Sequence, residues 1–402
     1  MTKKIINIKN ILIAILLFTA LTRLIRLDYP TSYVFDEVYH SFTAKEYLKG
    51  NTEAWDPFAT PPKGVAFEWT HPPLAKEIMT TSMFMTNSTD AWAYRLPGAL
   101  FGILCVYLIY LIGLRLLNPT GALISAFIFS IEGLNFVQSR SGMNDVYFVT
   151  FVLTSLLFFL KKRFIYSSIF FGLALSSKWA TVYLLGLYLF FIFKNRSFSK
   201  LFYFLIIPPL IYLISYIPYF LLGFSIEQFI ELQKQMWWYH TNLKATHGYA
   251  SPWWSWSLNL YPVWYFVEYQ GEKIANIFAS GNPIVFWFGL VGIIISIWEY
   301  FKTRSEKLLI LILGYLIFWL PWALSPRIMF LYHYSPSVPF LSLALGYQLN
   351  KIYQAGQKKL LIFLLILMFL GFVLMFPFLT GIPLPKDWVK YFFYTNLTQN
   401  PF

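Results

Sequence analysis

The chain has 402 residues, of which 58% are hydrophobic and only 12% are charged, and its formal net charge is +13 at pH 7. A soluble globular chain has about 45–50% apolar and about 25% charged residues, so a soluble core of this length would lack the polar surface to cover it. The composition excludes an ordinary cytosolic enzyme and indicates a polytopic membrane protein. The only cysteine, Cys105, rules out an intrachain disulfide.

Eleven apolar segments are long enough, or nearly long enough, to form transmembrane helices. The first could pass for a secretory signal peptide, but no small-residue cleavage site follows it, and we interpret it as an uncleaved first span. Two long segments, 27–91 and 223–281, interrupt the series. The sequence therefore predicts an all-α membrane protein with helices at 5–26, 92–114, 119–138, 145–160, 164–179, 180–193, 201–222, 282–300, 308–325, 328–349 and 360–379.

The distribution of Lys and Arg indicates the orientation in the membrane. If the N-terminus is cytoplasmic, the inner connections hold 16 basic and 2 acidic residues, and the remainder of the chain holds 15 basic and 16 acidic residues. Short cytoplasmic connections are enriched in Lys and Arg. We therefore expect a multi-pass plasma-membrane protein with both long segments and the C-terminus outside. The positive charge then needs no nucleic-acid partner to explain it.

The order of the segments divides the chain into three parts. Residues 1–222 are expected to form an N-terminal transmembrane catalytic module that includes the outer loop 27–91. Residues 223–281 form an outer aromatic-rich loop, and residues 282–402 form a C-terminal four-helix-type transmembrane module with an outer tail. Loops of this length in a compact protein usually carry function, so both outer segments are candidate sites.

The first outer segment contains two polar motifs. Asp36 and Glu37 are adjacent, so they cannot point the same way; one can face a reaction centre while the other meets a ligand or a structural partner. The alternative is a pair of solvated loop acids. Two prolines after His71 set an extended backbone before a short helix expected near Leu74, which could hold His71 and Lys76 in place. The alternative is an ordered loop corner.

Four cations lie at the outer membrane boundary: Arg95, Arg140, Lys178 and Arg327. Each could simply extend its charge from a helix end toward water. Four cations at one depth, however, suit a phosphate better than they suit one another, because Arg offers forked donors and Lys a point charge. A lipid phosphate that enters from the outer leaflet would meet them at this depth, beside the carboxylates of the first outer segment.

Three further polar residues are candidates for the same site. Asp145 lies at the expected start of a helix, where the helix dipole alone would also favour it. His333 and Tyr334 lie in a span that two prolines interrupt, which an unbroken lipid-facing helix would tolerate poorly. The sequence shows no Gly-rich nucleotide motif and no His, Cys or Asp cluster with convincing metal spacing. We expect neither a metal nor a cofactor.

Seven sequence stretches, in this order, resemble the protein O-mannosyltransferase family, whose members have the GT-C fold of membrane glycosyltransferases. The stretches are FDEVYH, THPPLAKE, YRLPGAL, QSR followed by Asp145, SSKWAT, GNPIVFW and RIMFLYHYSPSVPF. The acidic pair after the first span is shared by many GT-C enzymes and is weak alone. The HPPL, SKW and YHYSPSVPF stretches are more specific, and the resemblance runs from about residue 20 to about residue 350.

The resemblance implies an activity and assigns roles. The family transfers mannose from polyprenyl (dolichyl) phosphate mannose to Ser or Thr of secretory proteins, with inversion at the anomeric carbon, on the outer face of the membrane. Carried onto this sequence, Asp36 is the general base on the acceptor hydroxyl, and Glu37 contacts the acceptor peptide. Arg95 and Lys178 hold the lipid phosphate, helped by the other two boundary cations. The partners are the lipid-linked donor, an acceptor protein and membrane lipid.

The chain departs from the family pattern in two places. Eukaryotic members carry a β-trefoil insertion of well over a hundred residues in the second outer segment, whereas 223–281 has only 59 residues. We therefore expect a prokaryotic member without the trefoil. Ala75 replaces the usual Gly of the HPPL motif, which affects only the local backbone. The sequence leaves the oligomeric state open.

Two other functions remain as alternatives. Another GT-C transferase could use the same type of donor with a lipid or glycan acceptor, as the lipid-A aminoarabinose transferases do. The stretches YHYSPSVPF and GNPIVFW favour the protein-acceptor family. A membrane transporter is the more remote alternative, because transporters usually place polar groups near the bilayer midplane and contain internal repeats.

Overall fold

The computed structural model describes the backbone of residues 2–389 and the side chains of residues 8–389. Within this part of the chain, four helices are long and apolar enough to cross a membrane: Ala91–Leu116 (α4), Pro283–Thr303 (α13), Glu306–Leu324 (α14 with its 3₁₀ extension) and Lys358–Thr380 (α16). A fifth span results if Pro119–Ser130 (α5) and Gly133–Arg140 (α6), bent by 60° at their junction, are counted together. The predicted all-α class is confirmed, but a count of eleven spans is not.

The remaining expected segments also fall on helices, several of them shorter or broken. The expected helix at 328–349 starts only at Val338, because the proline-containing Leu331–Ser337 stretch is a 3₁₀ helix. The expected helix at 201–222 is interrupted before Pro218. The helices are Thr2–Leu24 (α1), Asp145–Leu160 (α7), Phe164–Leu175 (α8), Val182–Lys194 (α9), Leu201–Ile214 (α10), Ile217–Leu221 (α11) and Val338–Gln354 (α15).

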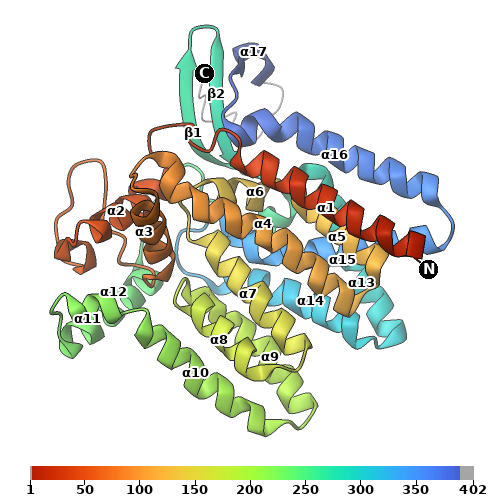
Figure 1. The fold of residues 1–402 in the computed structure, drawn as a ribbon, viewed down its shortest axis with the longest axis horizontal. Coiled ribbons are helices and arrows are strands. Elements are labelled where there is room, and N and C mark those ends of the chain that lie inside the picture. The colour runs from red at the N-terminus through yellow and green to blue at the C-terminus, as the bar shows by residue number, and fades with distance from the viewer. Residues whose placement is uncertain (1, 390–402) are drawn as a thin grey trace.

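Both long segments that were expected on the outer side, called the first and second outer segments, are structured rather than loop-like. The first contains a 3₁₀ helix at Phe35–Val38, another at Thr52–Trp55, and the helices His40–Leu48 (α2) and Leu74–Thr86 (α3). The start of α3 confirms the helix expected near Leu74. The second contains the helix Ile226–Asn242 (α12) and a 3₁₀ helix at Trp253–Leu258. The helices α2, α3 and α12 gather at the end of the helical body away from the N-terminus (Figure 1).

A small antiparallel sheet was not predicted from the sequence. Its strands are Val263–Gln270 (β1), Lys273–Ala279 (β2) and Leu384–Pro385 (β3), in the order β1-β2-β3. The β1–β2 hairpin projects from the helices beside the short helix Lys386–Val389 (α17) (Figure 1). The apolar and aromatic residues of β1 do not alternate with polar ones, so the sequence offers no clear period-2 signal.

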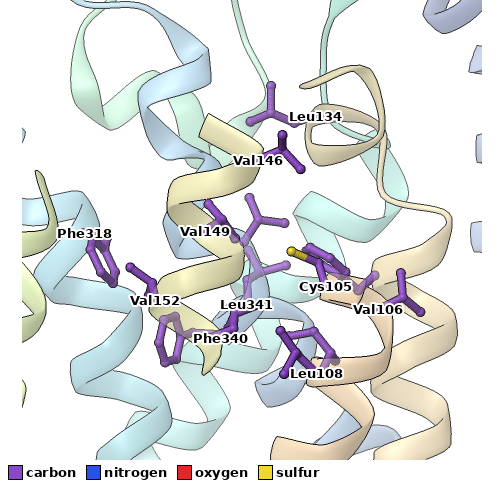
Figure 2. Packing of buried hydrophobic residues seen from close by; sticks show 14 of the residues in the cluster. Cys105, Val106, Leu108, Leu134, Val146, Val149, Val152, Phe318, Phe340 and Leu341 are labelled. Atoms are coloured by element: carbon purple, nitrogen blue, oxygen red, sulfur yellow. The ribbon is translucent and has the colours of Figure 1, made fainter. Parts of the chain in front are cut away.

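One hydrophobic core joins the N-terminal and C-terminal parts of the chain. Cys105 of α4, Val149 of α7, and Phe340 and Leu341 of α15 pack together in its centre (Figure 2). A Cβ atom added at Gly346 of α15 would lie only 3.0 Å from the Cα atom of Ser125 on α5, so these two helices cross in close contact. The expected boundary at residue 282 therefore separates stretches of sequence whose side chains share one core.

Two ion pairs join connections that were expected on the cytoplasmic side. Lys194 Nζ, at the end of α9, lies 3.0 Å from Glu306 Oε1 at the start of α14. Lys351 Nζ, near the end of α15, lies 2.8 Å from Glu299 Oε2 near the end of α13. Four helix ends that the charge pattern assigned to one side thus contact each other in two pairs. The contacts agree with the predicted alternation of the helices.

Candidate active site

The local backbone sends Asp36 and Glu37 in different directions. Both lie in the 3₁₀ helix Phe35–Val38, whose three residues per turn separate consecutive side chains by about 120°. The preceding Phe35 has a φ of 42°, in the left-handed region that a bulky residue adopts at an energetic cost. Glu37 enters the protein interior, whereas Asp36 faces a charged region formed by Glu68, Asp145 and two cations. The expected divergence of the two acids is therefore observed.

Glu37 and Arg95 form a fully buried, two-pronged ion pair. Arg95 Nε donates to Glu37 Oε1 at 2.8 Å, and Arg95 Nη2 donates to Glu37 Oε2 at 2.7 Å. Glu37 also accepts hydrogen bonds from the backbone N–H groups of Val34 and Gly142. Arg95 uses its other donors on the backbone carbonyls of Leu27, Pro30 and Ser32.

This pair ties the first outer segment to α4 and to the α6–α7 turn. Glu37 is 0% exposed and the Arg95 side chain 1% exposed, and protein groups already bind both of them. The structure therefore does not leave Glu37 free for an acceptor peptide or Arg95 free for a phosphate, contrary to the roles carried over from the resemblance.

Arg140 caps the C-terminal end of α1, and its guanidinium is already bound to backbone carbonyls. Its Nη1 donates to the carbonyls of Thr22, Arg23 and Ile25, and its Nη2 donates to that of Arg26. These carbonyls lie at and just beyond the end of α1. The last carbonyls of a helix have no donor within the helix, and the helix dipole favours a cation there. Arg95 and Arg140 both line a cavity of about 10 Å³, too small for a phosphate. The expected phosphate role of Arg140 therefore does not fit the structure.

Lys178 and Arg327 remain as cations beside an open cavity. Lys178 Nζ lies 2.8 Å from Asp145 Oδ1, so the α8–α9 turn is joined to the start of α7. Arg327 Nη1 is hydrogen-bonded to His240 of α12, and the buried Nε of Arg327 has no partner among the described residues. Both cations line a cavity of about 630 Å³. Its other walls include His71, His240 and His333, together with Trp179, Trp237 and Trp322.

The cavity suits an anion that carries an apolar chain. Its charge comes from Lys178 and Arg327, because the nearby imidazoles are neutral at pH 7. Burial, followed by the neighbouring His240 and Lys178, lowers the pKa of His71 well below its usual value. Burial and then Arg327 lower the pKa of His240 to about 4. The rings of His71 and His240 stack with their centroids 5.1 Å apart.

Lys76 is hydrogen-bonded to the backbone of His71, one of the residues in the cavity wall. Its fully buried Nζ donates to the carbonyl of His71 at 2.9 Å, and burial lowers its pKa to about 8. This hydrogen bond joins Lys76 to the proline-containing segment around His71. Tyr334 lies elsewhere: its hydroxyl is hydrogen-bonded to that of Tyr315 at 2.7 Å, in the buried contact between α14 and the 331–337 helix. It packs in the core rather than lining the cavity.

Asp36 has the properties of a general base. Burial, followed by the charges of Glu68 and Asp145, raises the pKa of Asp36 to about 7, while Lys178 and Arg327 oppose the rise. Among the described residues, none donates a hydrogen bond to its carboxylate. A carboxylate whose pKa lies near the ambient pH, and which is not bound to other protein groups, can accept a proton from a substrate.

Two residues near the site were missed in the sequence. Glu68 accepts hydrogen bonds from the hydroxyl of Thr70 and the N–H of His71. His240 reaches the site from α12, whose start is marked in the sequence by the capping box Ser225–Gln228. That signal predicts a helix but does not say where the helix packs. Within residues 2–389, no group of three or more His, Cys, Asp or Glu residues could hold a metal ion.

Comparisons with known proteins identify the family. The family model for dolichyl-phosphate-mannose–protein mannosyltransferases matches residues 13–242, more than half of the chain. The chain belongs to this family. The model for the C-terminal four-transmembrane region of protein-O-mannosyltransferases matches residues 225–396. The two matches together cover nearly the whole sequence.

Relatives and solved structures agree with this assignment. The chain is 24% identical to a polyprenol-phosphate-mannose–protein mannosyltransferase of Mycolicibacterium smegmatis, over 91% of this chain and 88% of the relative. A Corynebacterium glutamicum protein of the same name is 24% identical over 71% of each chain.

Among solved structures, a chain of the Saccharomyces cerevisiae Pmt1–Pmt2 complex bound to the sugar donor has a TM-score of 0.79 at 18% identity. The match covers 93% of this chain and 90% of that one. ArnT from Cupriavidus metallidurans, bound to undecaprenyl phosphate, has a TM-score of 0.60 at 14% identity, over 87% of this chain and 60% of that chain. These matches confirm the GT-C fold.

The buried pair predicts a structural phenotype for Arg95. Arg95→Gln leaves the Glu37 carboxylate buried without its counter-charge, so we expect a loss of about 3–5 kcal/mol of folding stability. The control is Lys194→Gln, which breaks a pair exposed on both sides and should cost less than about 1 kcal/mol. Thermal unfolding in detergent measures both. A stable Arg95→Gln protein that has lost only its affinity for polyprenyl phosphate would contradict the structural role.

Proposed function

We propose that this protein transfers mannose from polyprenyl-phosphate mannose to Ser or Thr hydroxyl groups of acceptor proteins, at the outer face of the membrane and with inversion. Membership of the family supports the reaction, and the relatives named for it support the type of donor. The observation that carries the assignment of the site is the position of Asp36. Its carboxylate is free of hydrogen bonds and faces Lys178 and Arg327, which line a large cavity.

The two cavity cations bind the lipid phosphate in this proposal. Arg327 has an unpaired Nε to offer, and Lys178 shares its charge with Asp145. The phosphate leaves as an anion, and cations held in place by the protein stabilise that charge without having to reorganise. The Trp and Pro side chains of the cavity wall then contact the first part of the polyprenyl chain.

Asp36 acts on the acceptor in this proposal. A Ser or Thr hydroxyl is a weak nucleophile, and removal of its proton during attack contributes roughly 10²–10⁴-fold to the rate. Attack on the anomeric carbon from the side opposite the leaving phosphate inverts its configuration. Glu37 does not meet the peptide; it holds the 3₁₀ helix so that its neighbour Asp36 keeps its direction.

The orientation in the membrane can be tested by cysteine labelling. Cys105 is buried, so it contributes little background. We expect Glu272→Cys, at the exposed tip of the β1–β2 hairpin, to react with a membrane-impermeant maleimide in intact cells. Lys358→Cys, at the exposed start of α16, should react only after permeabilisation. Reaction of both in intact cells would contradict the proposed topology.

The activity and its base can be tested in one assay. Purified protein receives polyprenyl-phosphate mannose and a Ser/Thr-rich peptide, and the mass of the peptide is followed. We expect the wild type to add mannose and Asp36→Asn to add none. Because Asp36 must be ionised to accept a proton and its pKa is about 7, kcat/KM should fall about tenfold for each pH unit below that value.

Glu77 provides the control for this pH profile. It lies on α3, and burial raises its pKa to about 8, so it titrates in a similar range. Glu77→Gln should leave the profile unchanged if Asp36 is the base. Near-full turnover of Asp36→Asn, or a profile that follows Glu77 instead, would show that the base is another group.

The phosphate role predicts coupled losses of donor affinity. Lys178→Gln and Arg327→Gln should each weaken binding of polyprenyl phosphate by about 1.5–3 kcal/mol, the range of charge-assisted hydrogen bonds. Their losses should not add, because both groups bind one ligand. Lys178→Arg should recover only part of the affinity, since Arg keeps the charge but changes the shape.

Two variants separate this role from a structural one. Combining Lys178→Gln with Asp145→Asn removes the unpaired acid, so stability should return while affinity stays low. Lys45→Gln removes a half-buried cation that lies over the rings of Tyr33 and Tyr94, and it should bind the donor normally. Restored affinity in the double variant would show that Lys178 serves only as the partner of Asp145.

A further inference from the structure

Three uncharged polar side chains near Asp36 are buried and leave hydrogen-bonding atoms unpaired. Tyr265 is 4% exposed, and Gln138 and Asn144 are 0% exposed. Within the described chain, neither amide atom of Asn144 has a hydrogen-bond partner, and the Tyr265 hydroxyl and the Gln138 amide have none besides each other. A buried polar group left unpaired costs about 1–3 kcal/mol, and most buried polar groups in native proteins are paired. Even when the Tyr265 hydroxyl and the Gln138 amide pair with each other, three amide atoms stay unpaired, and a ligand could pair them.

These side chains border the two acids of the site. The ring of Tyr265 stacks on Phe35, the residue before Asp36, with centroids 4.5 Å apart and planes 5° apart. The charged groups that act on the Tyr265 hydroxyl are Asp36 and Asp145, and the Gln138 amide lies within hydrogen-bonding reach of this hydroxyl. Asn144 directly precedes Asp145 in the chain. The three residues come from β1, α6 and the α6–α7 turn.

Two of these side chains, Tyr265 and Asn144, lie at irregular positions of the backbone. The register of β1 against β2 shifts between Trp264 and Phe266, so Tyr265 occupies a bulge, a device that re-aims a side chain next to a functional site. Asn144 occupies the N-cap position of α7, where an Asn side chain usually accepts a backbone hydrogen bond, yet it makes no such bond.

The chemistry of these groups matches the hydroxyl groups of a sugar. The hydroxyl and the two amides offer both donors and acceptors and carry no charge, as the hydroxyl groups of a hexose do. A phosphate would instead require the cations of the neighbouring cavity. We infer that Tyr265, Gln138 and Asn144 bind the hydroxyl groups of the transferred hexose and set its identity, an inference that rests on the proposed function.

Binding requires a small local movement. The unpaired atoms have no contact with water in the ligand-free protein, so the sugar must displace a side chain to reach them. Asn144 has no hydrogen bond to break when it moves, and Tyr265 and Gln138 need only exchange their mutual contact for bonds to the sugar. Their bonds to the sugar would form away from bulk water, where hydrogen bonds are electrostatically stronger.

The test uses Tyr265→Phe and Gln138→Leu, which remove the polar atoms assigned to the sugar and keep much of the side-chain volume. Thermal stability, affinity for polyprenyl phosphate, affinity for polyprenyl-phosphate mannose, and kcat/KM are measured for each variant. We expect unchanged or raised stability and unchanged affinity for polyprenyl phosphate. Affinity for the mannosyl donor and kcat/KM should fall roughly 3- to 10-fold per variant, as one or two neutral hydrogen bonds are lost. Discrimination against polyprenyl-phosphate glucose, which differs at C2, should also fall.

Tyr147→Phe is the matched control. Its hydroxyl is buried and unpaired, but it lies on α7 against Phe101, and no charged group acts on it. This variant should change neither donor affinity nor turnover.

Two results would overturn the inference. The first is wild-type affinity for the mannosyl donor in both test variants. The second is a loss of stability together with an equal loss of affinity for polyprenyl phosphate, which would make the groups structural. A wild-type protein that binds the mannosyl donor but transfers no mannose would contradict the proposed function alone, because the variants are still compared by their affinity for donors with and without the sugar.

Discussion

The buried pair of Glu37 and Arg95 is the interaction on which the site depends. Two opposite charges are taken out of water, and that cost is offset because backbone N–H and carbonyl groups from several segments complete their hydrogen bonds. The pair fixes the 3₁₀ helix of the first outer segment against α4. Asp36, the preceding residue in that helix, is thereby held near Lys178 and Arg327 without a hydrogen bond to its carboxylate.

The cations of the outer boundary fall into two groups for a physical reason. Arg95 and Arg140 lie near chain segments whose carbonyls lack partners, and a guanidinium with five donors can satisfy several carbonyls at once. Lys178 and Arg327 come from a turn and a loop that face the cavity, where their charges remain partly available. The equal depth expected from the sequence therefore did not imply a common ligand.

The site draws its parts from segments far apart in the chain. Asp36 comes from the first outer segment, Lys178 from the α8–α9 turn and Arg327 from the loop before the 331–337 helix. The β1–β2 hairpin adds Tyr265 through its contact with Phe35. The C-terminal helix α15 packs within the N-terminal core, so both halves of the sequence are needed to form the site.

The sequence by itself determined the membrane class, the positions of most of the apolar helices, the divergence of Asp36 from Glu37, and the helix that starts at Leu74, because hydropathy, charge and proline act locally. Only the tertiary structure decided that Glu37 and Arg95 bind each other, since their side chains meet across 58 residues of chain. It also decided that Tyr265 lies beside Asp36. Whether a buried charge is paired depends on the groups packed around it, and local sequence does not contain that information.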